Sequence, residues 1–296
     1  MKWIWGLYFW MIAPALWSQD HQWWVDNVGW DGETAWTQYL VFSPGRMGPN
    51  ALPVPSFSNG QVDSSHHLSW TNQLTFTKGE STYSTLLDVQ YVPLPNRLSF
   101  RLFWMPLEWF RTSHFLKTER KVFHEFYDDQ TAVGDVYLET SHALIHRSHY
   151  NAVLRLGYKF AASSHLGAAR FTDTPGYYFD ISFVRNFPLS THANLALSAM
   201  TGLYIWQTNN SPVHRQNDAF LYSVQLKLNH TYSTFILGLG GYIGYLNNGD
   251  QPHLMELGYR VERSAKWAIQ ITGRKGVNKD WPFTSLAIQI IKKIRT

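Results

Sequence analysis

The sequence of 296 residues contains no cysteine. It therefore offers no disulfide framework, no thiolate zinc site, no cysteine nucleophile and no cysteine to carry a lipid anchor. Charged residues make up only 16% of the chain, and the formal net charge is +4. This composition excludes the strongly basic balance that is typical of nucleic-acid-binding proteins.

Long apolar runs are also missing once the amino terminus is passed. Residues 1–18 contain the basic Lys2, an apolar run and the small residue Ser18, a layout that predicts a secretory signal peptide. The run is too short to cross a bilayer as a helix, and a buried amphipathic start is the alternative. Removal of this segment takes Lys2 with it and leaves a net charge of +3. The remaining sequence contains no stretch approaching the roughly 18 apolar residues that a membrane helix needs.

Aromatic residues are abundant instead, at 16% of the chain, and they alternate with polar residues. In residues 175–187, Tyr177, Phe179, Ile181 and Phe183 fall on one face, with Asp180 and other polar residues on the opposite face. Period-two alternation over about ten residues, repeated along the chain, is the signature of a transmembrane β-barrel. A soluble sandwich also alternates, but it rarely sets charges opposite so many large apolar residues. We predict twelve strands, at 65–76, 83–93, 97–111, 133–146, 150–161, 175–187, 192–207, 217–229, 232–246, 252–262, 265–274 and 282–294.

The connections between these strands alternate in length. Short connections follow the second, fourth, sixth, eighth and tenth strands, and longer ones follow most of the others; the short ones are "PLPN", "RSH", "PLST", "HT" and "RSA". Bacterial outer-membrane barrels have short periplasmic turns, longer outer loops and an even number of strands. The sequence thus predicts an all-β fold, an antiparallel up-and-down barrel at residues 63–296. We expect it in the lipid of the bacterial outer membrane, with both termini in the periplasm.

The inward faces of these strands carry charges of both signs. One interpretation is a selectivity lining or a solute site. The alternative is a satisfied network that fills a narrow barrel with its own side chains. The residues expected to line the lumen are Asp88, Arg101, Asp135, Glu139, Arg155, Lys159, Asp180, Lys227, Glu256, Arg260, Lys266 and Arg274.

Residues 19–62 precede the first predicted strand and are too aromatic to be a slack tail. Within them, "GRMGPNALPVP" at residues 45–55 holds two glycines and three prolines, which excludes a helix or an inner strand. One hypothesis places it in the periplasmic mouth or the lumen as a small plug, with Arg46 paired to an inward carboxylate. Its plug candidates are Arg46, Asn50, Pro53 and Pro55. The alternative is an extended lip against the barrel rim.

No constellation for catalysis, metal binding or a cofactor is visible. Ser65 and His66 are neighbours in the chain, so within a strand they point to opposite faces and cannot form a dyad. The thirteen histidines show no ligand spacing, and a solvated outer loop is expected for residues 115–130. The "GLGGYIG" stretch at 238–244 opens no helix, so it is not a dinucleotide loop; its glycines suit either a sharp coil of the wall or the close approach of a neighbouring aromatic ring.

The central stretch "GDVYLETSHALIHRSHYNAVLRLGYKFAASS" resembles a family of outer-membrane barrels labelled as phenol-degradation MetA-pathway proteins. The likeness rests on Gly134 and Asp135 followed by a strand, a turn and a strand, and it covers about a third of the chain. It implies a transporter of small, often hydrophobic compounds. "ARFTDTPGYYFDISF" and "GRMGPNALPVP" depart from that family and resemble an uncharacterised barrel group from bacteria with many outer-membrane machines.

Two functions therefore remain open from the sequence. The first is a channel or transporter for small solutes through a charged, partly plugged lumen. The second is a non-conducting structural or accessory barrel within an outer-membrane protein complex, docked through its periplasmic lip or outer loops.

Overall fold

The computed structural model describes residues 22–123, 129–208 and 214–294. The predicted signal peptide, residues 1–18, lies outside these ranges. No helix in the described ranges is long and apolar enough to cross a membrane.

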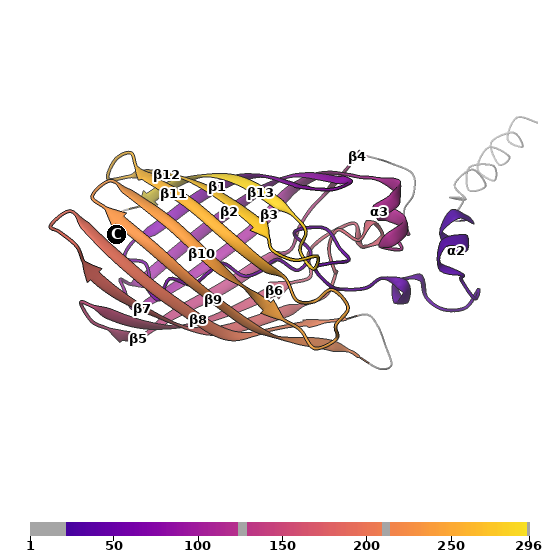
Figure 1. The fold of residues 1–296 in the computed structure, drawn as a ribbon, viewed down its shortest axis with the longest axis horizontal. Helices are drawn as coiled ribbons and strands as arrows, with labels where there is room; N and C mark the ends of the chain where they lie inside the picture. The colour runs from indigo at the N-terminus through magenta and orange to yellow at the C-terminus, as the bar shows by residue number, and fades with distance from the viewer. Residues whose placement is uncertain (1–21, 124–128, 209–213, 295–296) are drawn as a thin grey trace, which may run out of the picture.

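The strands form one antiparallel sheet that closes on itself through the pairing of β2 with β3 (Figure 1). The short β4 and the longer β5 pair with successive parts of β3, so together they occupy one position in the wall. The barrel therefore has twelve wall positions, as the sequence predicts. The strands are β1 (His66–Thr77), β2 (Glu80–Leu94), β3 (Leu98–Thr112), β4 (Asp129–Ala132), β5 (Val136–His146), β6 (Tyr150–Phe160), β7 (Gly176–Pro188), β8 (Ala193–Gln207), β9 (Gln216–His230), β10 (Ser233–Ile243), β11 (His253–Glu262), β12 (Trp267–Gly276) and β13 (Thr284–Ile294).

The two faces of the wall differ in chemistry, and β7 is typical. Tyr177 and Phe183 face outward and are about half exposed, whereas Tyr178, Asp180 and Ser182 face the lumen and are buried. Because side chains alternate along a strand, one sequence pattern supplies both an apolar outer surface and a polar interior. An apolar outer band of this kind is what a barrel presents to lipid.

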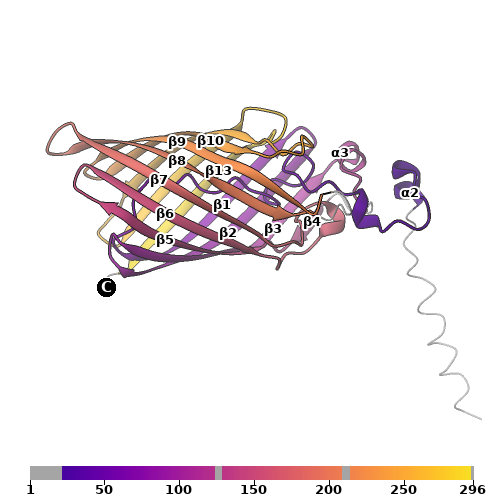
Figure 2. The same ribbon diagram turned by 90° about the horizontal axis from the view of Figure 1, so that it is seen from below.

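The two ends of the barrel also differ. The short turns lie at one end, next to the last described residue, Ile294. The longer connections lie at the other end with α2 (Gln22–Val28), η2 (Trp36–Tyr39), α3 (His114–Glu119) and η3 (Leu166–Ala168) (Figures 1 and 2). The Trp24 indole donates to the carbonyl of Lys121 (3.2 Å), and Asn27 donates to that of Thr118 (3.1 Å), which fixes α2 beside α3.

The two ends of the described chain lie at opposite ends of the barrel, whereas the sequence predicts both termini on one side. The described chain starts at the long-loop end and finishes at the short-turn end (Figure 1). Between α2 and β1 the chain runs through the barrel interior, and β1 begins at the short-turn end, where His66 pairs with Ile294. We call residues 44–62 the threaded segment.

Candidate functional site: the barrel lumen

The part of the threaded segment before Pro53, nearer the long-loop end, is held by buried aromatic residues. The hydroxyl of Tyr242 donates to the carbonyl of Leu52 (2.8 Å), and the Trp281 indole donates to that of Pro49 (3.4 Å). Just before the segment, the Trp206 indole donates to the carbonyl of Phe42 (3.1 Å). A proline-rich segment cannot form a regular β ladder, so its carbonyl groups find no partners in a sheet. The three side-chain donors satisfy carbonyl groups that would otherwise be buried without a hydrogen bond.

The part of the segment after Pro55 packs closely against the strands, because glycines and serines lie at the contacts. Phe57 lies against Gly240, where a Cβ atom would come within 2.7 Å of the ring. Gly60 has a φ of 68° and lies so close to β7 that a Cβ atom would be 2.7 Å from the backbone nitrogen of Val184. Between them, the hydroxyls of Ser58 and Ser182 are 2.7 Å apart. Glycine is required at such close approaches, so the wall and the segment are matched in shape.

The four plug candidates fall in different surroundings. Arg46 pairs with Glu119 of α3 (3.0 Å), and both side chains are nearly half exposed. The expected pairing of Arg46 with an inward carboxylate is therefore wrong, because its side chain reaches the outer loop rather than the lumen. Asn50 is buried and donates to Glu108 of β3 (2.5 Å). Pro53 and Pro55 line a cavity inside the barrel.

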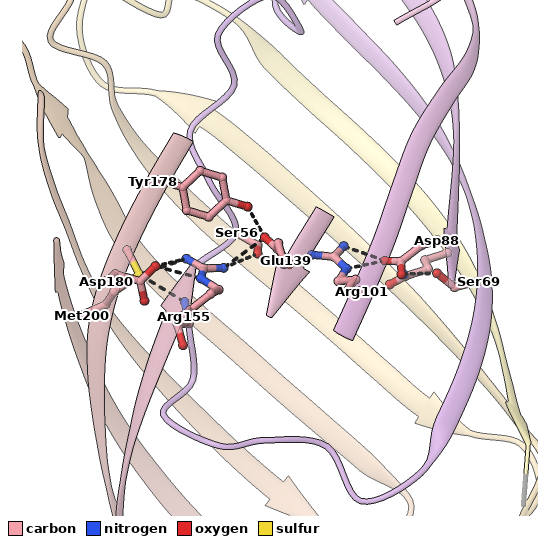
Figure 3. Close-up of polar contacts among 11 residues, drawn as sticks. Ser56, Ser69, Asp88, Arg101, Glu139, Arg155, Tyr178, Asp180 and Met200 are labelled. Carbon is pink, nitrogen blue, oxygen red and sulfur yellow. Dashed lines mark hydrogen bonds and ion pairs between the residues drawn. The ribbon is translucent and has the colours of Figure 1, made fainter. Parts of the chain in front are cut away.

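Five of the predicted lumenal residues form a continuous chain of ion pairs across neighbouring strands (Figure 3). The chain begins on β7 and ends on β2. Its links join Asp180 to Arg155 (2.7 Å), Arg155 to Glu139 (3.6 Å), Glu139 to Arg101 (3.0 Å) and Arg101 to Asp88 (2.6 Å). Each arginine lies between two carboxylates, so burial of the charges is compensated only while the chain is complete.

Arg155 also connects this chain to the threaded segment. Its Nη1 atom donates to the hydroxyl of Ser56 (2.9 Å), and Tyr178 donates a hydrogen bond to Glu139 (Figure 3). The contacts of Arg155 therefore include β5, β7 and the segment. A displacement of the segment would remove one of these hydrogen bonds and leave the ion pairs of the wall in place.

The remaining predicted residues separate into three groups. Lys159 and Asp135 form a buried pair (2.9 Å), and Arg274 pairs with Glu256 (2.8 Å). Arg260 and Lys227 face the lumen near the short-turn end. Lys266 does not line the lumen: it is an exposed residue of the turn between β11 and β12, because β12 begins one residue later.

A second buried charge cluster was not predicted. Arg170, in the loop after β6, binds Glu108 (2.7 Å) and Glu80, and Arg120 binds Glu80 (2.5 Å). Burial opposes the charge of Arg170, but Glu108 and Glu80 outweigh this effect and raise the pKa of its guanidinium above the usual value. The pairing of β2 with β3 shifts by one residue between Thr85 and Leu87. Strict alternation from the inward Arg101 would turn Glu108 outward. The register shift reverses this, so Glu108 faces inward.

A partly open cavity of about 170 Å³ lies inside the barrel beside the threaded segment. We call it the central cavity. Its lining is mainly apolar and aromatic, with Arg101 and Arg274 at its edge. The buried hydroxyls of Tyr137 and Tyr204 have no hydrogen-bond partner among the residues that the structure describes. Other lining residues include Pro53, Val54, Gln73, Phe103, Met105 and Phe171.

Two parts of the lumenal surface differ in how far they are filled. We call the lumenal faces of β6–β10 the packed wall, where the segment is seated and the inward side chains are largely buried. We call the lumenal faces of β1 and β11–β13 the open wall, where Thr71, Gln270, Thr272 and Gln289 are only half-buried. In the described part of the chain, no group of three or more histidine or carboxylate side chains is placed to hold a metal ion.

No family model and no curated protein matches the sequence. Among solved structures, the barrel is similar to the COG4313 outer membrane channel from Pseudomonas putida F1. The TM-score is 0.58 at 10% identity, with 81% of this chain and 99% of that chain covered. It is also similar to the KdgM porin in complex with disordered oligogalacturonate, with a TM-score of 0.51 at 6% identity, covering 77% of this chain and 99% of that chain.

The chain has the fold of an outer-membrane β-barrel. At such low identities the likeness establishes the architecture and no more, and none of the matches confirms the particular resemblance to the MetA-pathway family. The descriptions of both structures name a channel or a porin, not an enzyme.

Proposed function

We propose that this protein is an outer-membrane channel for small solutes and that the threaded segment closes it. The observation that supports the proposal is the unequal filling of the lumen. The segment is seated on the packed wall, while the open wall keeps half-buried polar side chains and borders the central cavity. A barrel filled only for stability would gain from packing on all sides, since an internal gap forfeits contacts.

Opening requires the segment to move, not the wall. Its links to the wall are single hydrogen bonds and apolar contacts, such as those of Ser58 with Ser182 and Tyr242 with Leu52. Such contacts are individually worth about 1 kcal/mol. The strands, in contrast, are joined by complete ladders and by the ion-pair chain. The segment is therefore the part of the lumen that can be displaced at the lowest cost.

The central cavity indicates the kind of solute. The lining is mainly apolar and aromatic, with Arg101, Arg274 and Asp135 among its members and two buried hydroxyls that have no partner among the described residues. Such a lining suits a small molecule with an apolar body and a polar group. This agrees with the resemblance of residues 134–164 to MetA-pathway barrels, which implies transport of small, often hydrophobic compounds. The channel and porin structures that share the fold also support the proposal.

A second candidate is a non-conducting accessory barrel. The observation in its favour is the closure of the long-loop end, where Leu40, Phe42 and Met47 pack against Val122 and Ala169. A barrel whose amino-terminal residues are fixed at that end could present α2 and α3 to a partner in an outer-membrane complex.

A reversible lock on the threaded segment distinguishes the two functions. The chain has no cysteine, so the double variant Ser58→Cys with Ser182→Cys introduces a single pair, at hydroxyls that are 2.7 Å apart. Single-channel current is recorded in a planar bilayer, first oxidised and then after reduction. We expect the oxidised variant to be silent and the reduced variant to show the opening steps of the wild type.

The two single-cysteine variants are the matched controls, and neither should respond to the redox change. Equal conductance of the oxidised and reduced double variant would contradict closure by the segment. Silence of the wild type and of all variants would favour the accessory barrel.

A further inference from the structure

A second cavity, of about 220 Å³, opens at the short-turn end of the lumen. It lies between the last residues of the threaded segment and the ends of β7–β12, away from the central cavity. We call it the short-turn vestibule. Its lining is mainly polar and includes Asn59, Gln61, Lys227, Asn229, Arg260 and Glu262.

Cations exceed carboxylates at this vestibule. Glu262 is shared between Arg260 (2.9 Å) and Lys293 of β13 (2.7 Å). Lys227 forms no ion pair with any residue that the structure describes. The lining itself therefore holds two cations, Lys227 and Arg260, and one carboxylate, Glu262, while Asp63 and Glu256 act on Lys227 from outside it. The net positive charge lies in a partly buried space, where it is screened less than at an open surface.

The strand neighbours of Lys227 explain why it forms no ion pair with the described residues. Lys227 pairs with Ile236 of β10, and Ile236 pairs with Gly258 of β11. Along β11 the nearest inward carboxylate on one side is Glu256, which is bound to Arg274. On the other side Arg260 faces inward. On β8, Lys227 pairs with Ala196, a small residue that leaves space beside the lysine.

Hydrogen-bond donors surround the same space. The side-chain oxygen of Asn59 accepts from the backbone of Gln61 (2.9 Å), and that of Asn229 accepts from Thr234 (3.2 Å). Their NH₂ groups thus have no acceptor among the described residues. Arg260 uses only its Nε atom for Glu262, so its two terminal nitrogens are also available there. Ammonium, guanidinium and amide N–H groups together form a donor set for an anionic oxygen ligand.

We infer that the short-turn vestibule binds small organic anions through a carboxylate or phosphate group, with Lys227 as the principal contact and Arg260 as the second. A volume of about 220 Å³ suits a small dicarboxylate or a phosphate ester rather than an oligomer. Binding there needs no conduction. The role of the vestibule as an entry site for anionic solutes, however, rests on the proposed channel function. It adds anions to the solutes that the channel would carry.

The test is equilibrium dialysis of the purified full chain in detergent against radiolabelled succinate. The wild type should bind succinate saturably. Inorganic phosphate should compete with succinate for the site, and the neutral analogue succinamide should not. Lys227→Met should weaken binding at least about tenfold, the effect of losing one charge-assisted hydrogen bond, and Lys227→Arg should retain most of it. Arg260→Gln should weaken binding as well, and this variant leaves Lys227 unchanged.

Lys266→Met is the matched control, because Lys266 lies in an exposed turn at the same end and its loss changes the net charge equally. It should bind succinate within about twofold of the wild type. Absence of saturable binding to the wild type would overturn the inference, as would equal weakening by Lys227→Met and Lys266→Met. If Lys227→Met does not fold, the same comparison is made with Arg260→Gln.

The outcome is separable from that of the channel experiment. Conduction without succinate binding would refute the anion site and leave the channel in place. Binding without conduction would refute the channel and leave the anion site.

Discussion

The packed wall and the open wall of the lumen are built from the same alternating strands, yet they do different things. On the packed wall, glycines and buried aromatic residues accept the threaded segment, and the inward side chains are buried except near the short-turn end, where Lys227 and Asn229 line the vestibule. On the open wall, β1, β12 and β13 contribute inward Thr, Gln and Ser residues, several of which are only half-buried. The strand pattern sets the barrel, and the segment decides which side of it is filled.

The comparison also separates two uses of lumenal charge. Asp180, Arg155 and Glu139 are buried and bound to each other, which is how a barrel keeps charges in a filled interior. Lys227 and Arg260, near the short-turn end, have binding capacity left. The first group holds the wall and the segment in place, and the second group is available to a ligand.

The largest effect should come from breaking the ion-pair chain on the packed wall. Arg155→Met leaves Asp180 and Glu139 buried with fewer partners and should lower the free energy of unfolding by about 3–5 kcal/mol. Arg274→Met on the open wall removes a partially exposed guanidinium from the buried Glu256, which keeps a hydrogen bond from Gln225, and should cost less, about 1–3 kcal/mol. Urea unfolding of the two variants in lipid vesicles, followed by tryptophan fluorescence, measures both. Equal losses would mean that the two walls do not differ in packing.

A smaller effect should follow from adding one methyl group to the packed wall. Gly240→Ala on the packed wall brings a Cβ atom against Phe57 and the carbonyl of Tyr222, so the threaded segment must shift. We expect a loss of about 1–3 kcal/mol. The control Gly273→Ala adds the same methyl group on the lipid-facing side of β12, where it meets only the carbonyl of Ser285, at 3.9 Å, and should stay within about 0.5 kcal/mol of the wild type. The same unfolding assay applies, and equal losses in the two variants would contradict close packing of the segment against Gly240.

Sequence periodicity predicts the wall of this protein well, since alternation and turn length depend on local sequence. The predicted strand at 150–161 corresponds to Tyr150–Phe160, and the one at 192–207 to Ala193–Gln207. The inward orientation of Arg155, Asp180 and Glu139 follows from the same period-two rule. Their joining into one chain with Arg101 and Asp88 follows from strand register, which hairpin symmetry predicts only for adjacent strands.

The parts that the sequence did not predict depend on tertiary contacts or on a local irregularity. Glu108 departs from the alternation set by Arg101 because of the register shift in β3, and Pro106, which cannot donate to a ladder, was the available signal. Arg170 lies in a loop, where no period applies. The path of the threaded segment depends on Gly60 and Gly240, whose role is visible only once Val184 and Phe57 lie beside them.

The most direct test of the difference between the two walls is thiol labelling of single introduced cysteines, since the chain has none of its own. Gln289→Cys places the thiol on the half-buried open wall, and Ser223→Cys places it on the buried packed wall. With a small, charged, water-soluble maleimide applied to the protein in vesicles, Gln289→Cys should react at least about tenfold faster, because thiol reactivity depends on access to solvent. Equal rates at the two positions would show that the segment does not divide the lumen, and would contradict both the closed state and the proposed mode of opening.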